Sequence, residues 1–383
     1  MIKNIKKIFK VLIYYISCLS IRNKRKVIYG AWFGNKFADN SKYLYRMAIK
    51  DKELRNIWIT KSEKVYKEMK EFGYEVYMSK SLKAIFHQLT AGIYFTCTGK
   101  EDVDYYLLGS AKHVELWHGV PLKKIMYDDK YNQSIDTRES QLKTVLKNRM
   151  KQKVYVIATS KKIKEIYINA FRLESERILN LGQPRNDVFF NDDIEDINFS
   201  KEFKNKKVIL YMPTHRNEGK TRLKITEIMD LPKLNKICKE NDYIFLIKKH
   251  YYHIDEEENI DQYENIIDIT KEIYDSQLLL KYAEILITDY SSCYIDYLLL
   301  NRPIIFYNFD YKNYIMNDRE MYFEYSKVTP GEKVINYLEL EHEILNLISK
   351  KDIYKEERER VKSIFYSIEN QRSVSVNLLN TLI

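Results

Sequence analysis

Short apolar runs rich in β-branched residues alternate with longer stretches of helical periodicity from residue 26 onward. The runs have the length of strands, and the stretches between them carry apolar residues three and four positions apart. This alternation predicts an α/β fold with parallel strands joined by helices. We expect strands at 26–31, 56–60, 74–78, 93–98, 113–116, 154–158, 178–181, 208–212, 243–248, 266–269, 285–288 and 303–308.

A chain of 383 residues is too long for one ordinary core, and a polar stretch rich in Asp, Asn and Glu separates two sets of strands. We therefore expect two Rossmann-like domains, 26–195 and 196–353, which face a central cleft and bind ligands at the carboxyl ends of their strands. The tail, 354–383, has a helical pattern and is expected to pack across both domains. Further helices are expected at 161–171, 271–282 and 292–300.

Residues 1–25 form a separate amphipathic pattern. Ile8, Leu12 and Ile16 recur at helical spacing, with lysines before the apolar run 11–21 and four cations after it. As a helix this run is about 16 Å long, which is too short to cross a bilayer. A helix packed on the protein body is one interpretation. A helix lying in an anionic membrane interface is the other, and we favour it.

The formal net charge of +10 indicates an anionic partner, which is a nucleic acid, an acidic membrane surface or a phosphorylated substrate. The four cysteines are scattered without a C-x-x-C pair, which argues against structural zinc and a disulfide framework. The chain has no H-E-x-x-H, no G-x-x-x-x-G-K-S/T and no G-x-G-x-x-G. We therefore expect no metal and no cofactor.

Asp102-Val103-Asp104 spells a DxD, the metal–nucleotide signature of a different glycosyltransferase architecture. Its setting is a charged segment of a chain whose other motifs offer cations to phosphate. We therefore interpret it as a surface loop.

The segment 117–124, Trp-His-Gly-Val-Pro-Leu-Lys-Lys, follows a predicted strand and contains the first candidate for chemistry. Reactive side chains are often found in such Gly/Pro-punctuated loops on a rigid frame. A histidine with a pKa near 6.5 is suited to take a proton from an alcohol at neutral pH. His118 is therefore the candidate base, and the two lysines favour an anionic substrate.

The segment 288–296 contains the most specific motif, a buried strand followed by a tight turn and a helix that Ser291 and Ser292 open. Free backbone N–H groups and two hydroxyls at a helix start form a cradle for a diphosphate. Asp296 lies one helical turn later and is expected to reach a ligand hydroxyl. Plain N-capping by serine is the alternative, and we favour ligand binding.

Other predicted strands end in cations that share an edge with these motifs. For each, a structural turn with a surface cation is the alternative to phosphate binding. These cations are Arg185 in the first half, and Arg216, Lys248, Lys249 and His250 in the second, where Thr214 adds a hydroxyl.

Together, segments 117–124, 211–216, 248–250 and 288–296 resemble the CDP-glycerol glycerophosphotransferase family of teichoic acid synthesis. The resemblance implies a GT-B fold, no metal requirement, and peripheral attachment to the cytoplasmic face of the cell membrane. It also implies transfer of glycerol phosphate or ribitol phosphate from a CDP-alditol to a hydroxyl of a lipid-linked acceptor, with release of CMP. By position it implies donor contacts from His118, Gly119, Val120, Pro121, Leu122, Arg185, Pro213, Thr214, Lys248, Lys249, His250, Ser291, Ser292 and Asp296.

In this interpretation, His118 deprotonates the acceptor and fixed cations hold the developing negative charge, among them Arg185, Arg216, Lys248 and the catalytic candidate His250. Three alternatives remain open: a GT-B glycosyltransferase that uses a nucleotide sugar, a basic nucleic-acid-binding protein, and a membrane-associated scaffold. The sequence leaves open glycerol or ribitol, primer addition or polymerisation, the acceptor and the oligomeric state.

Overall fold

The computed structural model describes residues 2–130, 154–191, 203, 206–214, 216, 223–249, 258, 260–272, 274–317, 320–370 and 372–383. The chain forms two compact units. Unit 1 comprises residues 1–118, 126–187 and 366–383, and unit 2 comprises residues 119–125 and 188–365.

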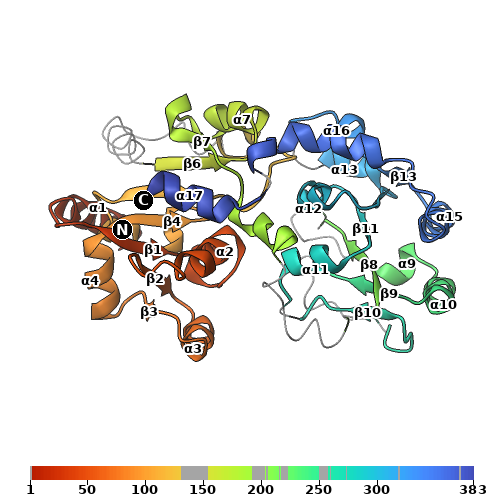
Figure 1. The fold of residues 1–383 in the computed structure, drawn as a ribbon, viewed down its shortest axis with the longest axis horizontal. Coiled ribbons are helices and arrows are strands. Elements are labelled where there is room, and N and C mark those ends of the chain that lie inside the picture. Colours follow the sequence, from red (N-terminus) through yellow and green to blue (C-terminus); the bar gives the residue numbers. More distant parts are fainter. Residues whose placement is uncertain are drawn as a thin grey trace. The chain divides into compact units, whose positions relative to one another are not determined.

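Unit 1 is built on a seven-stranded parallel sheet with the strand order β3-β2-β1-β4-β5-β6-β7 (Figure 1). The chain moves outward from β1 to β3 and then returns to the other side of β1, so the order reverses between β1 and β4. In open parallel sheets, ligands bind beyond the carboxyl ends of the strands at such a reversal. The strands are β1 (Asn23–Tyr29), β2 (Arg55–Thr60), β3 (Val76–Met78), β4 (Ala91–Thr96), β5 (Lys112–Glu115), β6 (Val154–Ala158) and β7 (Ile178–Asn180).

Serine residues begin several helices of unit 1. The hydroxyls of Ser62, Ser81 and Ser160 each accept a backbone N–H three residues later, which is ordinary N-capping. The α-helices are α1 (Ile2–Ser17), α2 (Asp39–Ala48), α3 (Glu63–Glu71), α4 (Leu82–Thr90), α7 (Lys161–Phe171) and α17 (Val374–Leu382). The 3₁₀ turns are η1 (Trp32–Gly34), η2 (Lys100–Asp102), η3 (Tyr105–Leu107), η4 (Met126–Asp128), η6 (Ser175–Arg177) and η11 (Ile368–Asn370), and η7 (Pro184–Phe190) begins in unit 1 and ends in unit 2.

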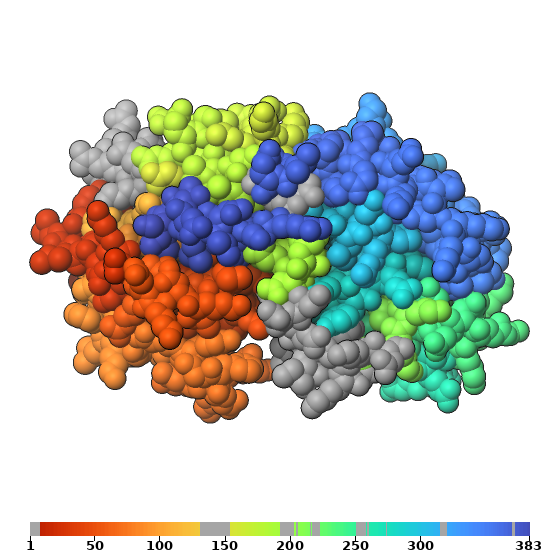
Figure 2. Space-filling model, viewed as in Figure 1, coloured from red at the N-terminus to blue at the C-terminus, as the bar shows by residue number. Residues whose placement is uncertain are grey.

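The carboxyl-terminal helix belongs to the core of unit 1. Figure 2 shows α17 in dark blue against the surface of this unit, and α17 contacts α2. Leu378 and Leu382 are buried among core residues from β1, β2 and α2. The Asp187 carboxylate accepts the backbone N–H groups of Val374 and Ser375 at 2.7 and 2.8 Å, so it caps this helix.

Unit 2 contains a six-stranded parallel sheet with the order β10-β9-β8-β11-β12-β13, and here the order reverses between β8 and β11. The strands are β8 (Lys207–Met212), β9 (Tyr243–Ile247), β10 (Ile266–Asp268), β11 (Ile285–Thr288), β12 (Ile304–Tyr307) and β13 (Glu332–Val334). The helices are α9 (Ile225–Ile228), α10 (Leu231–Asn241), α11 (Ser276–Tyr282), α12 (Cys293–Tyr297), η10 (Leu298–Leu300), α13 (Tyr311–Asn317), α14 (Tyr325–Val328), α15 (Tyr337–Ile348) and α16 (Lys355–Phe365).

The predicted α/β fold is confirmed, and every predicted strand is present with its ends shifted by at most three residues. Strand β13 was missed because it has only three residues, two of them charged. It pairs with β12 next to Gly331, where an added Cβ would lie 2.1 Å from the Ile304 carbonyl oxygen. A glycine is therefore required at this close approach.

Two helices differ from the expectation. The helix predicted at 271–282 begins only at Ser276, because the Asp275 side chain accepts the Gln277 N–H and caps it there. The predicted tail is divided: α16 belongs to unit 2 and α17 to unit 1. The predicted domain boundaries 195/196 and 353/354 stay a proposal.

Candidate active site

The turn that carries His118 has a strained backbone. It follows β5, with Trp117 at φ 59° and Gly119 at φ 145° on either side of the histidine. A tryptophan seldom adopts a positive φ, and such conformations cluster at functional sites. The turn leaves His118 exposed while Trp117 is buried.

The imidazole of His118 is held in one tautomer. Its Nδ1 lies 3.0 Å from the carbonyl oxygen of Cys97. Because a carbonyl only accepts, Nδ1 carries the hydrogen, and Nε2 keeps its lone pair in the neutral ring. Although the residue as a whole is exposed, burial of the imidazole lowers the pKa of His118, against the opposing effect of the Asp39 carboxylate. A neutral ring with a basic Nε2 is the form that a general base requires.

Arg185 holds the main chain of this turn. One guanidinium nitrogen donates to the His118 carbonyl at 2.9 Å and to the Asp39 carboxylate at 3.0 Å. The backbone N–H of Arg185 donates to Asn40, whose amide donates to the Trp117 carbonyl at 2.8 Å. The structure thus uses Arg185 to fix the His118 turn, and its predicted contact with phosphate stays a proposal.

A buried polar cluster that the sequence analysis missed lies beneath the same turn. Glu115 accepts the Trp117 N–H at 3.0 Å, and the Thr96 hydroxyl oxygen lies 2.7 Å from both Glu115 and His113. Burial raises the pKa of Glu115 to about 8 and lowers that of His113 to about 3, so both are neutral at pH 7. Two titratable residues at alternate positions of a predicted buried strand were the signal for this cluster.

Replacing Glu115 by glutamine is expected to raise the melting temperature more at pH 8 than at pH 5. An unfolded glutamate has a pKa of about 4.3, whereas folded Glu115 has a pKa of about 8. Its contribution to stability is therefore complete below the unfolded value and is lost as the pH rises through the folded one. Glutamine stays neutral, and its amide can donate to Thr96.

Thermal unfolding of both proteins across this pH range measures the effect. The matched control is Glu53→Gln, since Glu53 forms an exposed pair with Arg25 at 3.4 Å. If the difference in melting temperature between Glu115→Gln and the wild type does not change with pH, this contradicts the raised pKa of Glu115.

The interpretation of the DxD as a surface loop was wrong. Asp102 is fully buried, and its carboxylate accepts the backbone N–H groups of Cys97, Thr98 and Phe33 at 2.6–2.8 Å. Asp104 is also buried, and it accepts from Gln88 and Tyr106. In the part of the chain that the structure describes, no group of three or more His, Cys, Asp or Glu residues could hold a metal ion.

In unit 2, the loops after β8 and β11 meet where the strand order reverses. The Asp289 carboxylate accepts the backbone N–H groups of Thr214 and Tyr290 at 2.9 and 2.6 Å. The Thr214 hydroxyl is buried and has no hydrogen-bond partner among the described residues. Because an unsatisfied buried hydroxyl costs free energy, this one is a good candidate for a ligand contact.

Arg216 follows β8, as expected, but its guanidinium is bound by carboxylates of unit 2. Its guanidinium donates to Asp310 at 2.6 Å and Asp289 at 2.8 Å, and lies over the rings of Tyr290 and Tyr314. The two carboxylates neutralise its charge and leave it buried. Arg216 therefore cross-links the loops after β8, β11 and β12, and this geometry does not favour a phosphate contact.

The lysines after β9 are also bound within unit 2. Lys249 is buried and pairs with Glu258 at 3.0 Å and Asp268 at 3.6 Å. The ammonium of Lys248 donates to backbone carbonyls, among them that of Ile269 at 2.9 Å. His250, the second catalytic candidate, lies outside the described residues.

At the serine pair, the structure does not show plain capping by Ser292. Helix α12 starts at Cys293, and the Ser292 side chain makes no capping hydrogen bond. The Ser291 hydroxyl accepts the Cys293 N–H at 3.4 Å instead. Asp296 is buried and accepts from Gln277 on α11 at 3.0 Å, so the structure directs it toward that helix.

The residues after His118 belong to unit 2. Val120 and Leu122 are buried, and the Leu122 carbonyl accepts the Tyr322 N–H at 3.0 Å. Lys123 pairs in antiparallel fashion with Met321. The ammonium of Lys124 lies 2.5 Å from the Glu320 carboxylate, so this lysine is an ion-pair partner.

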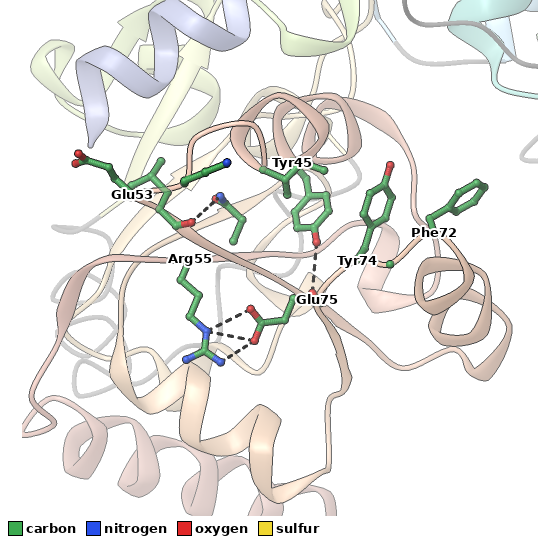
Figure 3. Close-up of a pocket in the computed structure, with 11 residues that line it drawn as sticks. Tyr45, Glu53, Arg55, Phe72, Tyr74 and Glu75 are labelled. Atoms are coloured by element: carbon green, nitrogen blue, oxygen red, sulfur yellow. Dashed lines mark hydrogen bonds and ion pairs between the residues drawn. The ribbon is translucent and has the colours of Figure 1, made fainter.

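Figure 3 shows a hollow of about 590 Å³ in unit 1. Arg55, which begins β2, and Glu75, which precedes β3, form an ion pair there at 2.8 Å. The hollow is therefore at the amino ends of the strands, opposite the edge where parallel sheets bind ligands.

Comparison with known proteins finds similarity to one family and to its members. Residues 12–383 match the family described as CDP-Glycerol:Poly(glycerophosphate) glycerophosphotransferase. The teichoic acid glycerol-phosphate transferase of Staphylococcus aureus is 29% identical over 97% of each chain. The teichoic acid poly(glycerol phosphate) polymerase of Bacillus spizizenii is 28% identical over 92% of this chain and 90% of that protein.

Among solved structures, that of the wall teichoic acid polymerase TagF has a TM-score of 0.76 at 26% identity, and covers 100% of this chain and 95% of that one. This likeness and the two parallel sheets confirm the expected GT-B fold.

Proposed function

Because the chain belongs to the CDP-glycerol:poly(glycerophosphate) glycerophosphotransferase family, and so is a transferase that uses a CDP-alditol donor, we propose the donor, the acceptor and the residues that act on them. The donor is CDP-glycerol, and the acceptor is a hydroxyl of a membrane-lipid-linked polymer. The acceptor oxygen bonds to the phosphorus that carries glycerol, the bond from that phosphorus to the bridging oxygen breaks, and CMP leaves.

The observation that carries the donor site is the unpartnered buried hydroxyl of Thr214. It lies where the strand order of unit 2 reverses, and Ser292 follows β11 at the same edge of the sheet. This edge is where doubly wound sheets bind phosphates. In the proposal, Thr214 and Ser292 bind the diphosphate, and His250 adds positive charge.

On the acceptor side, Nε2 of His118 takes the proton of the attacking hydroxyl. The tautomer fixed by the Cys97 carbonyl supports this role. Phosphoryl transfer depends on positioning and on charge stabilisation, so a fixed imidazole and a fixed turn are the contributions expected from this unit.

The test is a titration of purified protein with CDP-glycerol and CDP-ribitol, followed by CMP release with a lipid-linked acceptor. We expect faster turnover with CDP-glycerol, and we expect Ser292→Ala to weaken donor binding about 10-fold. Ser349→Ala, at an exposed serine that follows α15, is the control. Faster turnover with CDP-ribitol would reassign the donor, and unchanged binding by Ser292→Ala would remove the diphosphate contact.

For the location, we propose peripheral attachment to an anionic membrane through α1. One face of this helix is docked on unit 1: the Tyr14 hydroxyl donates to the Gly109 carbonyl at 3.0 Å. Another face leaves Ile8, Leu12 and Ile16 more than half exposed. No helix in the described part of the chain is long and apolar enough to cross a bilayer. A docked helix with an exposed apolar stripe near lysines suits an interfacial position.

The double variant Leu12→Glu/Ile16→Glu is expected to bind phosphatidylglycerol vesicles at least about 10-fold more weakly, because two apolar contacts are lost. Vesicle co-sedimentation measures this. Leu338→Glu alters an exposed leucine of α15 and serves as control. Equal vesicle binding by the double variant and wild type would refute attachment through α1.

A further inference from the structure

Asp102, the first carboxylate of the DxD motif, is connected to the candidate base His118 by hydrogen bonds. Oδ2 of Asp102 accepts the N–H groups of Cys97 and Thr98, both at 2.8 Å. Oδ1 accepts the Phe33 N–H at 2.6 Å and the Thr98 hydroxyl. The carboxylate therefore fixes the loop after β4 and attaches the loop after β1 to it.

One peptide group lies between this carboxylate and the imidazole. The N–H of Thr98 and the carbonyl of Cys97 belong to the same peptide. The first donates to Asp102, and the second accepts the Nδ1–H of His118 at 3.0 Å. A hydrogen bond at one end of a peptide polarises it and strengthens the bond at the other end.

We propose that Asp102 is a positioning residue for His118 that acts through the Cys97–Thr98 peptide. This inference rests on the proposed role of His118 as base. Asp102 holds the ring in the Nδ1–H tautomer. When Nε2 takes the acceptor proton, the ring becomes positive and keeps its Nδ1–H bond, so the polarised carbonyl and the carboxylate charge stabilise it.

Three charged groups around the imidazole decide the sign of the effect. The carboxylates of Asp39 on α2 and Asp102 on η2 favour the protonated ring, and Arg185 on η7 disfavours it. Removing the charge of Asp102 alone therefore leaves the ring harder to protonate. The acid limb of kcat/KM should then move to lower pH.

The chain provides a matched control in Asp104. This second carboxylate of the motif is also buried, but it accepts hydrogen bonds from Gln88 and Tyr106. Among the described residues it makes no hydrogen bond to the Cys97–Thr98 peptide or to the His118 turn. A purely structural effect of losing a buried carboxylate should appear in both variants. An effect on His118 should appear only at Asp102.

The experiment compares Asp102→Asn with Asp104→Asn in the full chain. For Asp102→Asn we expect kcat to fall about 10- to 100-fold, KM for CDP-glycerol to stay unchanged, and the acid limb to shift to lower pH. With ¹⁵N-histidine labelling, the ring of His118 should lose its single Nδ1–H tautomer. For Asp104→Asn we expect none of these changes, whatever its melting temperature.

The proposal would be overturned if Asp102→Asn kept the kcat, the acid limb of kcat/KM and the His118 tautomer of the wild type. If that variant does not fold, Thr98→Val removes only the hydroxyl that binds the carboxylate, and it should shift the same quantities by a smaller amount. No shift in Thr98→Val would then overturn the proposal. The NMR readout needs no activity, so a failure of His118 as base, seen as full turnover by His118→Ala, is distinguished from a failure of Asp102 to set the tautomer.

Discussion

His118→Ala is expected to lower turnover by about 10²–10⁴-fold, the usual contribution of a positioned general base, while its dissociation constant for CDP-glycerol stays unchanged. The reason is the division of roles in the proposal. The imidazole acts on the acceptor hydroxyl, and the Cys97 carbonyl fixes the tautomer that makes Nε2 basic. Stopped CMP-release assays give turnover, and donor titration gives binding.

The same histidine should set the acid limb of the wild-type profile. Burial lowers the pKa of His118, so activity should fall only below the ordinary histidine value of about 6.5. His342→Ala, at an exposed histidine of α15, is the control and should keep wild-type turnover. Unchanged turnover in His118→Ala would exclude it as the base.

Arg216→Ala is expected to cost unit 2 about 3–5 kcal/mol of stability, the range measured when one partner of a buried ion pair is removed. Its ion-pair partner Asp289 has no exposed side-chain surface, and Asp310 is one-fifth exposed. Without the guanidinium, two neighbouring carboxylates stay in the protein without their cation. Denaturant unfolding measures the loss.

The control is Arg360→Ala, which breaks an exposed pair with Glu357 on α16 and should cost less than about 1 kcal/mol. A second arm combines Arg216→Met with Asp289→Asn, which removes both charges of the more deeply buried pair and should recover part of the stability. Equal losses for Arg216→Ala and Arg360→Ala would show that the buried network does not stabilise unit 2.

The fold was accessible from the sequence because burial on both faces makes parallel strands apolar over their whole length. The runs that became β6 and β11 were located to the residue. Strand β13 lacks this signal, since its pairing depends on the close approach at Gly331 rather than on its own composition.

The candidate site was only partly accessible. The glycine and proline around His118 marked a turn at a strand end. The partners of the cations were not visible, because Arg216 pairs with residues 73 and 94 positions away. Asp102 was misread for the same reason: Phe33, whose backbone it binds, is 69 positions away.

The most direct test of the proposed function is to identify which bond of the donor breaks. Incubation with CDP-glycerol and a lipid-linked acceptor, with simultaneous measurement of the nucleotide and of new phosphodiester, identifies that bond. The proposed transfer predicts CMP and phosphodiester in equal amounts, both lost together in His118→Ala. Release of CDP, or of CMP without a new phosphodiester, would contradict it.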